Sequence, residues 1–294
     1  MANSPDRVLI LGTGLLGSSI GLALRAAGFA GTIVGWDKDA EQLRVALERG
    51  AIQSAASSAE DALQQAGSCQ LIVLGGPVYA IIDWMERLAG VLQAHQLVTD
   101  VGSTKARITA AGERLFNQPG KQSGHAGFLP GHPMAGKEVS GAAEADAGLF
   151  RGAAWIFTPA SVLTGQAAET AAAWREWVKR FGAEPLDLEA QRHDQLMAWT
   201  SHLPQFVATA LAALLEDEVG DAPELNQIGG RALREMTRLG SSPYSMWRDV
   251  ASTNAEAIAA ALSALEQRLA HLRENLRTPE LRDEFDRANH FRKP

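Results

Sequence analysis

The chain has 294 residues, of which 46% are hydrophobic and 21% are charged, and its formal net charge is −7. This length predicts two domains of ordinary size, and the negative charge disfavours a nucleic-acid partner, because proteins that bind the phosphate backbone present a basic surface. Cys69 is the single cysteine, which excludes an intrachain disulfide and a zinc site built on cysteines. No apolar run is long enough to cross a bilayer and the first residues lack a secretory signal, so we expect a cytoplasmic protein with no membrane partner.

Short β-rich runs alternate with helical stretches from residue 7 to about residue 158. The runs are RVLIL, TIVGW, LIVLGG, LVTDVG, FLPGHP and AWIFTP. Alternation of strand and helix predicts a doubly wound parallel sheet. The expected fold class is therefore α/β, with the first domain at residues 1–165.

The first strand runs into GTGLLGSSIGLAL, where Gly12, Gly14 and Gly17 have the G-x-G-x-x-G spacing. Gly12 permits a tight turn, Gly14 lets the backbone approach a pyrophosphate, and Gly17 lets helix and strand pack closely. The motif follows a strand, opens a helix and precedes Asp37 at the end of TIVGW, which is the context of a Rossmann dinucleotide-binding domain. The Asp37 carboxylate can accept from ribose hydroxyls and repels a 2′-phosphate, so we expect NAD rather than NADP, even with Lys38 beside it.

A ligand of such a sheet lies beyond the carboxyl ends of its strands, so the loops after those strands should surround the cofactor. Three loops fit this position: GGPVY at 75–79, DVGSTKA at 100–106 and GHPMAGKEVSG at 131–141. The residues expected to bind NAD are Gly12, Thr13, Gly14, Leu15, Leu16, Gly17, Asp37, Gly75, Pro77 and Ser103.

The pattern changes after residues 158–161 to long segments rich in alanine and leucine. They lie at roughly 166–181, 189–217, 224–239 and 251–276, and their periodicity predicts helices. We expect an all-helical second domain at residues 166–294. Between the first two helices AEPLDL predicts one more strand at a sheet edge, and the final RDEFDRANHFRKP is expected to be an exposed or frayed tail.

Five motifs, in this order, resemble the TyrA family of prephenate and arogenate dehydrogenases. They are LGTGLLGSSIGLAL, TDVGSTK, GHPMAGKEVSG, HDQLMAWTSHLPQ and REMTRLGSSPYSMW, and the resemblance covers residues 7 to about 255. It implies a dinucleotide-binding domain followed by a helical domain that binds substrate and forms a homodimer. It also implies NAD-dependent oxidative decarboxylation of prephenate, a small dicarboxylate, to 4-hydroxyphenylpyruvate in tyrosine biosynthesis.

The resemblance implies roles for the residues that match these motifs. His132 corresponds to the catalytic histidine, which takes the proton of the ring hydroxyl as hydride leaves the same carbon. Ser103 corresponds to a serine that bridges the hydroxyl, the histidine and the nicotinamide. Glu138 matches an acidic residue at the mouth of the site, His202 a substrate-binding histidine, and Arg238 the arginine that receives a carboxylate.

Elementary chemistry agrees with these roles. An unperturbed imidazole, with a pKa of about 6.5, is mostly able to accept a proton at pH 7. A guanidinium gives bidentate recognition of a carboxylate. Arg231, Arg234 and Arg238 fall at i, i+3 and i+7, so a helix can place all three on one cationic face, although Arg231 and Arg234 could also pair with Glu235 or remain solvated.

Three further residues bear on the substrate site. Trp247 is expected to wall it, as the family suggests, although it would also suit a core. Relatives that prefer prephenate commonly read SHLPH, whereas this chain has Gln205 at the last position, so arogenate stays an alternative substrate. His193 lies nine residues before His202, on the opposite face of a straight helix, and is expected to be structural or at the rim.

We expect no metal, because no cluster has metal-ligand spacing and hydride transfer needs none.

Two other functions stay open. A β-hydroxyacid dehydrogenase would share the fold but generally places a catalytic lysine on the first long helix of the second domain, and residues 189–217 contain no lysine. A non-catalytic NAD-sensing dimer would leave the combination of His132, Ser103, His202 and Arg238 without a reason.

Overall fold

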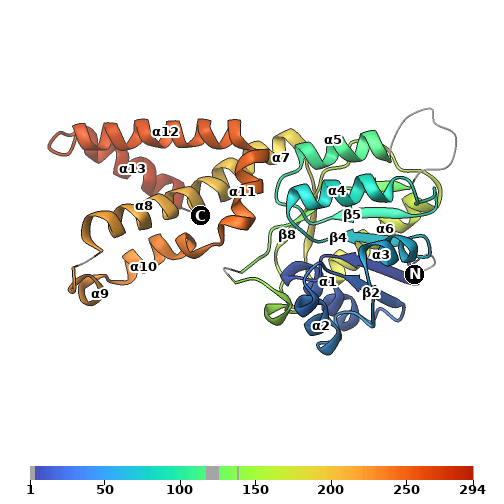
Figure 1. Cartoon of the computed structure of the whole chain (residues 1–294). Helices are drawn as coiled ribbons and strands as arrows, with labels where there is room; N and C mark the ends of the chain where they lie inside the picture. Colours follow the sequence, from blue (N-terminus) through green and yellow to red (C-terminus); the bar gives the residue numbers. More distant parts are fainter. Residues whose placement is uncertain (1–3, 117–125, 138, 221, 294) are drawn as a thin grey trace. The chain divides into compact units, whose positions relative to one another are not determined.

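The computed structural model describes residues 4–116, 126–137, 139–220 and 222–293. The chain forms two compact units (Figure 1). The first comprises Met1–Leu196 and Ser241–Thr253, and the second comprises Met197–Gly240 and Asn254–Pro294. The first unit therefore extends well beyond the domain boundary expected at residue 165.

A six-stranded parallel sheet forms the centre of the first unit. Its strands are β1 (Arg7–Leu11), β2 (Thr32–Trp36), β3 (Ser54–Ala55), β4 (Leu71–Leu74), β5 (Leu97–Asp100) and β6 (Gly127–Leu129). Their order is β3-β2-β1-β4-β5-β6, and every neighbouring pair is parallel. The strand order reverses between β1 and β4, which is where such sheets bind ligands.

Helices cover both faces of this sheet. They are α1 (Leu15–Ala26), α2 (Ala40–Glu48), α3 (Ala59–Ala66), α4 (Val78–Leu88), α5 (Ala106–Leu115) and α6 (Gly165–Arg180). Alternate residues of a strand face opposite sides, so Val8 and Ile10 pack with α1 and α6, whereas Leu9 and Leu11 pack with α3, α4 and α5. Figure 1 shows α4 and α5 side by side on their face. Because α6 helps to cover the sheet, it belongs to the first unit.

A second, three-stranded sheet follows the main one in the chain. It contains β7 (Gly131–Pro133), β8 (Ala154–Phe157) and β9 (Glu184–Asp187) in that order. β7 pairs antiparallel with β8, and β8 pairs parallel with β9. The strand predicted in AEPLDL is therefore confirmed, as the edge strand β9 of this small sheet.

The remaining elements of the first unit join it from two parts of the chain. They are the short helix η1 (Ala142–Glu144), the helix α7 (Ala190–Met197), whose last residue begins the second unit, and α11 (Tyr244–Thr253). The helix α11 contacts α4. A segment that the sequence assigned to the helical domain thus packs on the dinucleotide-binding fold.

The second unit is helical throughout the residues that the structure describes. Its elements are the π-helical turn η2 (Ala198–His202), α8 (Leu203–Val219), α9 (Leu225–Ile228), α10 (Arg231–Thr237), the 3-10 turn η3 (Arg238–Ser241), α12 (Ala255–Glu274) and α13 (Glu280–Arg292). The tail expected to be exposed or frayed is exposed, but it forms the helix α13 and is not frayed. Glu284 of α13 accepts a hydrogen bond from Arg268 of α12 at 2.7 Å, and this pairing helps to hold the exposed helix.

The observed architecture confirms the predicted fold class, a doubly wound parallel sheet followed by a helical domain. In the ranges that the structure describes, no helix has the length and apolar character needed to span a membrane. Within the same ranges, no three His, Cys, Asp or Glu side chains form a group that could hold a metal ion.

Candidate functional site

The glycine-rich turn after β1 is built on close backbone approaches. Gly12 has φ +99°, and a Cβ added there would lie 1.8 Å from the carbonyl oxygen of Gly75. A Cβ added to Gly17 would lie 2.0 Å from the carbonyl oxygen of Gly12. At Gly14, in contrast, an added Cβ would meet nothing within 4 Å, so the turn leaves open space at the position expected to face a pyrophosphate.

The start of α1 suits an anion. Its first turn, which begins with Leu15 and Leu16, contains no acidic residue and no side chain caps its N–H groups. Unpaired N–H groups and the helix dipole attract a phosphate at such a position. These features, together with the space at Gly14, fit the pyrophosphate of NAD.

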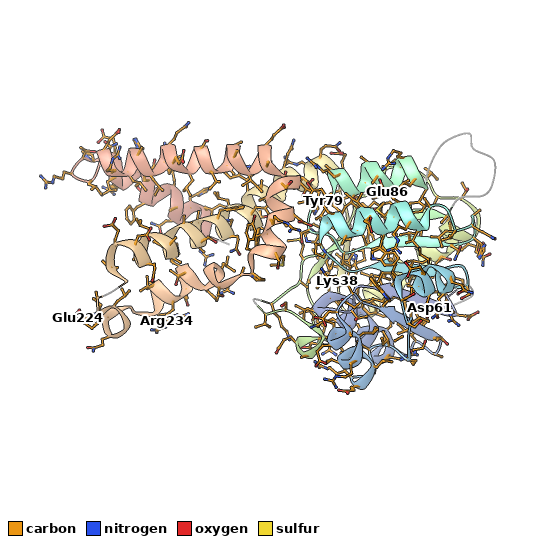
Figure 2. The ribbon with its side chains drawn as sticks, in the orientation of Figure 1. Lys38, Asp61, Tyr79, Glu86, Glu224 and Arg234 are labelled. Carbon is orange, nitrogen blue, oxygen red and sulfur yellow. The ribbon has the colours of Figure 1, made fainter. Side chains whose placement is uncertain are left out.

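Asp37 follows β2 and fixes the glycine-rich turn. Its Oδ2 accepts a hydrogen bond from the backbone N–H of Thr13 at 2.7 Å, and its Oδ1 accepts one from the N–H of Asp39 at 3.0 Å. A carboxylate has about four acceptor positions, so it retains capacity for ribose hydroxyls. Lys38, labelled in Figure 2, is exposed beside it. The structure thus brings Asp37 to the predicted cofactor turn.

The loop after β4 lies against the same turn. The N–H of Gly75 donates to the carbonyl oxygen of Leu11 at 2.7 Å, and Pro77 is the residue that precedes the first turn of α4. Gly75 and Pro77 therefore lie at the carboxyl edge of the sheet, where the sequence placed them.

A buried ion pair joins the loop after β5 to the start of β7. The Lys105 ammonium donates to Asp100 Oδ2 and, at 2.6 Å, to the carbonyl oxygen of Gly131. Asp100 also accepts from the N–H groups of Gly102 at 2.8 Å and Gly131 at 3.1 Å. Both charged side chains are fully buried. This clamp of Asp100 and Lys105 fixes the turn that carries the half-buried Ser103. It also holds Gly131, the residue that precedes His132.

His132 lies on β7 and is hydrogen-bonded to a second histidine. Its Nδ1 is 2.8 Å from Nε2 of His193 on α7. Nδ1 of His193 is in turn 2.8 Å from Oδ1 of Asp194. Asp194 also accepts from the backbone N–H groups of Lys105 at 2.7 Å and Ala106 at 2.9 Å, at the start of α5.

Burial controls the charge of the groups around this chain of contacts. Burial lowers the pKa of His193, and the positive charge of Lys105 lowers it further, while the hydrogen bond to Asp194 and the negative charges of Asp194 and Asp100 act in the opposite direction. Burial also lowers the pKa of Lys105, against the attraction of Asp100 and Asp194. A fully buried imidazole is thus favoured in its neutral form at His193.

His193 was expected to be structural or at the rim, and its full burial excludes the rim. The sequence did not single out Asp194, Asp100 or Lys105. Two local signals were present. Histidine and aspartate stand side by side in HDQ at the start of a helix, and an acid and a base flank Ser103 in DVGSTK. Neither signal specifies a partner, because His132 and His193 are 61 residues apart.

Two other predicted site residues are Trp247 and Glu138. Trp247 lies on α11 and is half-buried. That helix is tied to α4 by the hydrogen bond of 2.7 Å between Ser252 and Tyr79, which Figure 2 labels, so Trp247 lies in the same unit as His132. Glu138 lies outside the residues that the structure describes.

In the second unit, His202 is buried at the end of the π-helical turn. Its Nδ1 is 3.2 Å from the amide nitrogen of Asn254. An amide nitrogen can only donate, so Nδ1 of His202 accepts and its Nε2 carries the proton. π-helical turns are frequent at functional sites. His202 is accordingly set up to donate through Nε2.

Gln205 is 4% exposed and its amide is fixed. Its Nε2 donates to the carbonyl oxygen of Leu239 at 2.7 Å and to Oγ1 of Thr209 at 3.2 Å. An amide flip would place Oε1 against the Leu239 carbonyl, and two acceptors repel each other. Leu239 directly follows Arg238, so Gln205 holds the turn that carries this arginine.

The three arginines lie on α10 and on the turn that directly follows it. Arg238 begins the 3-10 turn η3, after α10 has ended at Thr237. Arg231 pairs with Glu235 at 2.6 Å, and Arg234, labelled in Figure 2, donates to the carbonyl oxygen of Gly229 at 3.0 Å. The alternative in which Arg231 pairs with Glu235 is therefore confirmed.

Family models match most of the chain. The model described as "Prephenate dehydrogenase, nucleotide-binding domain" matches residues 20–184. The model described as "Prephenate dehydrogenase, dimerization domain" matches residues 189–290. The two matches meet shortly before residue 196, where the chain first passes from the first unit to the second.

Individual relatives agree with these matches. The chain is 31% identical to the prephenate dehydrogenase of Bacillus subtilis over 259 residues, which are 88% of this chain and 67% of that protein. It thus spans about two thirds of the length of that relative. The crystal structure of Aquifex aeolicus prephenate dehydrogenase with hydroxyphenyl propionate and NAD+ has a TM-score of 0.83 and 28% identity, over 98% of this chain and 97% of that one. Synechocystis arogenate dehydrogenase has a TM-score of 0.75 and 26% identity, over 97% and 98%.

Proposed function

This chain belongs to the prephenate dehydrogenase family, and from that premise we propose that it converts prephenate to 4-hydroxyphenylpyruvate with His132 as the base. It is an NAD-dependent oxidoreductase with a nucleotide-binding domain. The single observation that supports the role of His132 is its place on β7. It directly follows Gly131, which the clamp of Asp100 and Lys105 holds, and its Nδ1 is hydrogen-bonded to His193. Its Nε2 is then the ring nitrogen that serves as base.

The reaction removes a hydride and a carboxylate from a cyclohexadienol ring. Bound NAD supplies the hydride acceptor. Nε2 of His132 takes the proton of the ring hydroxyl while the oxygen forms a carbonyl and hydride leaves the same carbon. The bond from ring to carboxylate then breaks and releases carbon dioxide, and its electron pair makes the ring aromatic. The resulting phenolate takes the proton back from His132, so the step involves no net release of a proton.

Other residues of the chain are proposed to bind the substrate. Nε2–H of His202 would donate to an oxygen of the substrate, as supported by the contact of its Nδ1 with Asn254. Arg238 would bind a carboxylate in a bidentate way. Ser103 would bridge the hydroxyl and the nicotinamide, Glu138 would stand at the mouth of the site, and Trp247 would wall it.

Arogenate is the second candidate substrate. The chain resembles an arogenate dehydrogenase from Synechocystis, and it has Gln205 where prephenate-preferring relatives commonly have histidine. Arogenate carries an ammonium, which a protonated histidine would repel, whereas glutamine lacks that charge. Because the Gln205 amide is held by Leu239, its influence on substrate choice would come from this missing charge and not from a flip of the amide.

The helical unit is proposed to form a homodimer, and the protein is proposed to act in the cytoplasm. The match of residues 189–290 to a dimerization domain supports the first proposal. Exposed apolar side chains on α8, α9 and α10 supply surface for such an interface, and they include Leu214, Ile228 and Met236. Light scattering of the purified chain measures its mass and would contradict this proposal by giving that of a monomer.

The test of function is formation of NADH from NAD and each substrate. We expect turnover with prephenate, and His132→Asn should lower it by about 10² to 10⁴-fold with KM nearly unchanged, the usual loss when a general base is removed. His95→Asn is the matched control, because His95 is exposed. Gln205→His should shift the ratio of kcat/KM values toward prephenate. Full activity in His132→Asn, or no NADH from either substrate in the wild type, would contradict the proposal.

A further inference from the structure

Behind His132 a chain of hydrogen bonds runs to the first turn of α5. His132 contacts His193, His193 contacts Asp194, and Asp194 accepts from the backbone N–H groups of Lys105 and Ala106. His193 is fully buried and Asp194 is 5% exposed. In the reaction described so far His193 only occupies Nδ1 of His132, and Asp194 has no role.

The direction of each hydrogen bond follows from the end at α5. A backbone N–H can only donate, so both oxygens of Asp194 act as acceptors. The N-terminal end of a helix also favours a negative charge, and the two contacts place Asp194 there as a carboxylate. A carboxylate cannot donate, so the hydrogen bond of 2.8 Å between His193 and Asp194 has its proton on Nδ1 of His193.

A neutral imidazole carries one proton, so its other nitrogen must accept. Burial and the nearby Lys105 ammonium lower the pKa of His193, against the effects of Asp194 and Asp100, which favours the neutral form. Nε2 of His193 therefore accepts, and Nδ1 of His132 donates to it over 2.8 Å. In neutral His132 the lone pair is then confined to Nε2.

We propose that Asp194, acting through His193, fixes the tautomer and the orientation of His132 so that Nε2 faces the substrate hydroxyl as a base. Both are positioning residues. When His132 takes the proton of the hydroxyl on Nε2, its Nδ1–H keeps its acceptor on His193, so the imidazolium forms without a change in this contact. The inference rests on the proposed function, in which His132 is the base.

The tautomer can be measured without turnover. In protein labelled with ¹⁵N at histidine and kept above pH 7.5, about one unit above the usual imidazole pKa, the spectrum distinguishes protonated Nδ1 from protonated Nε2. We expect His132 and His193 both to be Nδ1–H tautomers, assigned from the signals lost in His132→Asn and His193→Gln. In Asp194→Asn, His132 should no longer be a single Nδ1–H form, because an amide can donate to His193 as well as accept. A wild-type His132 with its proton on Nε2 overturns the proposal.

Kinetics then separate positioning from other roles. Gln at position 193 can still accept from His132 and donate to Asp194, so His193→Gln should keep kcat within about tenfold of the wild type, whereas His193→Leu should lower it by about 10² to 10³-fold. KM should change little in either variant, since only the base is affected. His95→Gln and His95→Leu are the surface controls.

Each other outcome has a defined meaning. Wild-type kcat in His193→Leu overturns the proposal. Equal losses in the Gln and Leu variants also overturn it, because they would require His193 to carry the proton itself. A wild-type enzyme that oxidises neither prephenate nor arogenate overturns the proposed function instead, and the wild-type spectrum still decides the tautomer. If the Leu variant does not fold, the wild-type spectrum still identifies the tautomer of His132.

Discussion

The buried pair of Lys105 and Asp100 predicts a large loss of stability when one partner is removed. In Lys105→Met the Asp100 carboxylate stays buried and loses the ammonium that it is paired with, and breaking a buried pair in this way costs about 3–5 kcal/mol. Asp100 keeps the N–H groups of Gly102 and Gly131 as donors. We therefore expect a loss near the lower limit, about 3 kcal/mol, which is a large share of the stability of an ordinary domain.

A matched change at the surface provides the control. Lys179 pairs with Glu176 at 2.6 Å, and the two side chains are 55% and 52% exposed. Exposed pairs contribute about 0–1 kcal/mol, so Lys179→Met should leave the free energy of unfolding within 1 kcal/mol of the wild type.

Urea unfolding followed by tryptophan fluorescence measures both variants, because Trp155 and Trp174 are buried in the core of the first unit. A double variant, Lys105→Met with Asp100→Asn, removes the unpaired charge and should recover part of the loss. The clamp also fixes the residue before His132, so kcat/KM should fall in Lys105→Met and not in Lys179→Met. Equal losses of stability in the two single variants would refute the reasoning.

Three further predictions follow from single residues. Asp37 lies at the cofactor turn, where its carboxylate would repel the 2′-phosphate of NADP, so the wild type should use NAD with a kcat/KM at least about tenfold above that for NADP. Asp37→Ala should reduce this ratio, and comparable values in the wild type would count against Asp37 as the selector. Arg238→Ala should raise KM by about 10 to 100-fold, the equivalent of about 1.5–3 kcal/mol for an exposed charge-assisted contact, and a normal KM with slow turnover would exclude this role. Because the pKa of His193 is lowered in the folded protein, below about pH 6.5 this imidazole binds a proton more readily in the unfolded chain than in the folded one. Stability should therefore fall as the pH drops from about 6.5 toward 5. His193→Gln should show a weaker fall, and identical slopes of unfolding free energy against pH would contradict the assignment.

The sequence by itself determined the features whose signals are local. The spacing of Gly12, Gly14 and Gly17 requires contacts within one turn, and the positive φ of Gly12 and the crowding at Gly17 agree with it. The alternation of strand and helix predicted the doubly wound sheet, because each element shows its own periodicity. The order of the five motifs was sufficient to place the chain in its family, and Asp37 lies at the turn where the motif placed it.

The boundaries of domains and helices depended on packing. The helix α6 has the alanine-rich pattern of the second half of the chain, yet Trp174 and Val178 are buried in the core of the sheet domain. The helical spacing of Arg231, Arg234 and Arg238 did not show that α10 ends at Thr237 and that a 3-10 turn begins at Arg238. That turn contacts a distant segment, because Gln205 donates to the carbonyl oxygen of Leu239.

Only the tertiary structure decided what surrounds His132, the proposed base. His193 faces His132 across 61 residues of chain, and Asp194 accepts from the first N–H groups of a helix 88 and 89 residues away. Hydrogen bonds between distant segments leave no periodic trace in a sequence, since they depend on how β5, β7 and α7 meet. The motif around His132 was therefore enough to propose it as a base, but the choice of the nitrogen proposed to accept the proton depended on its neighbours in space.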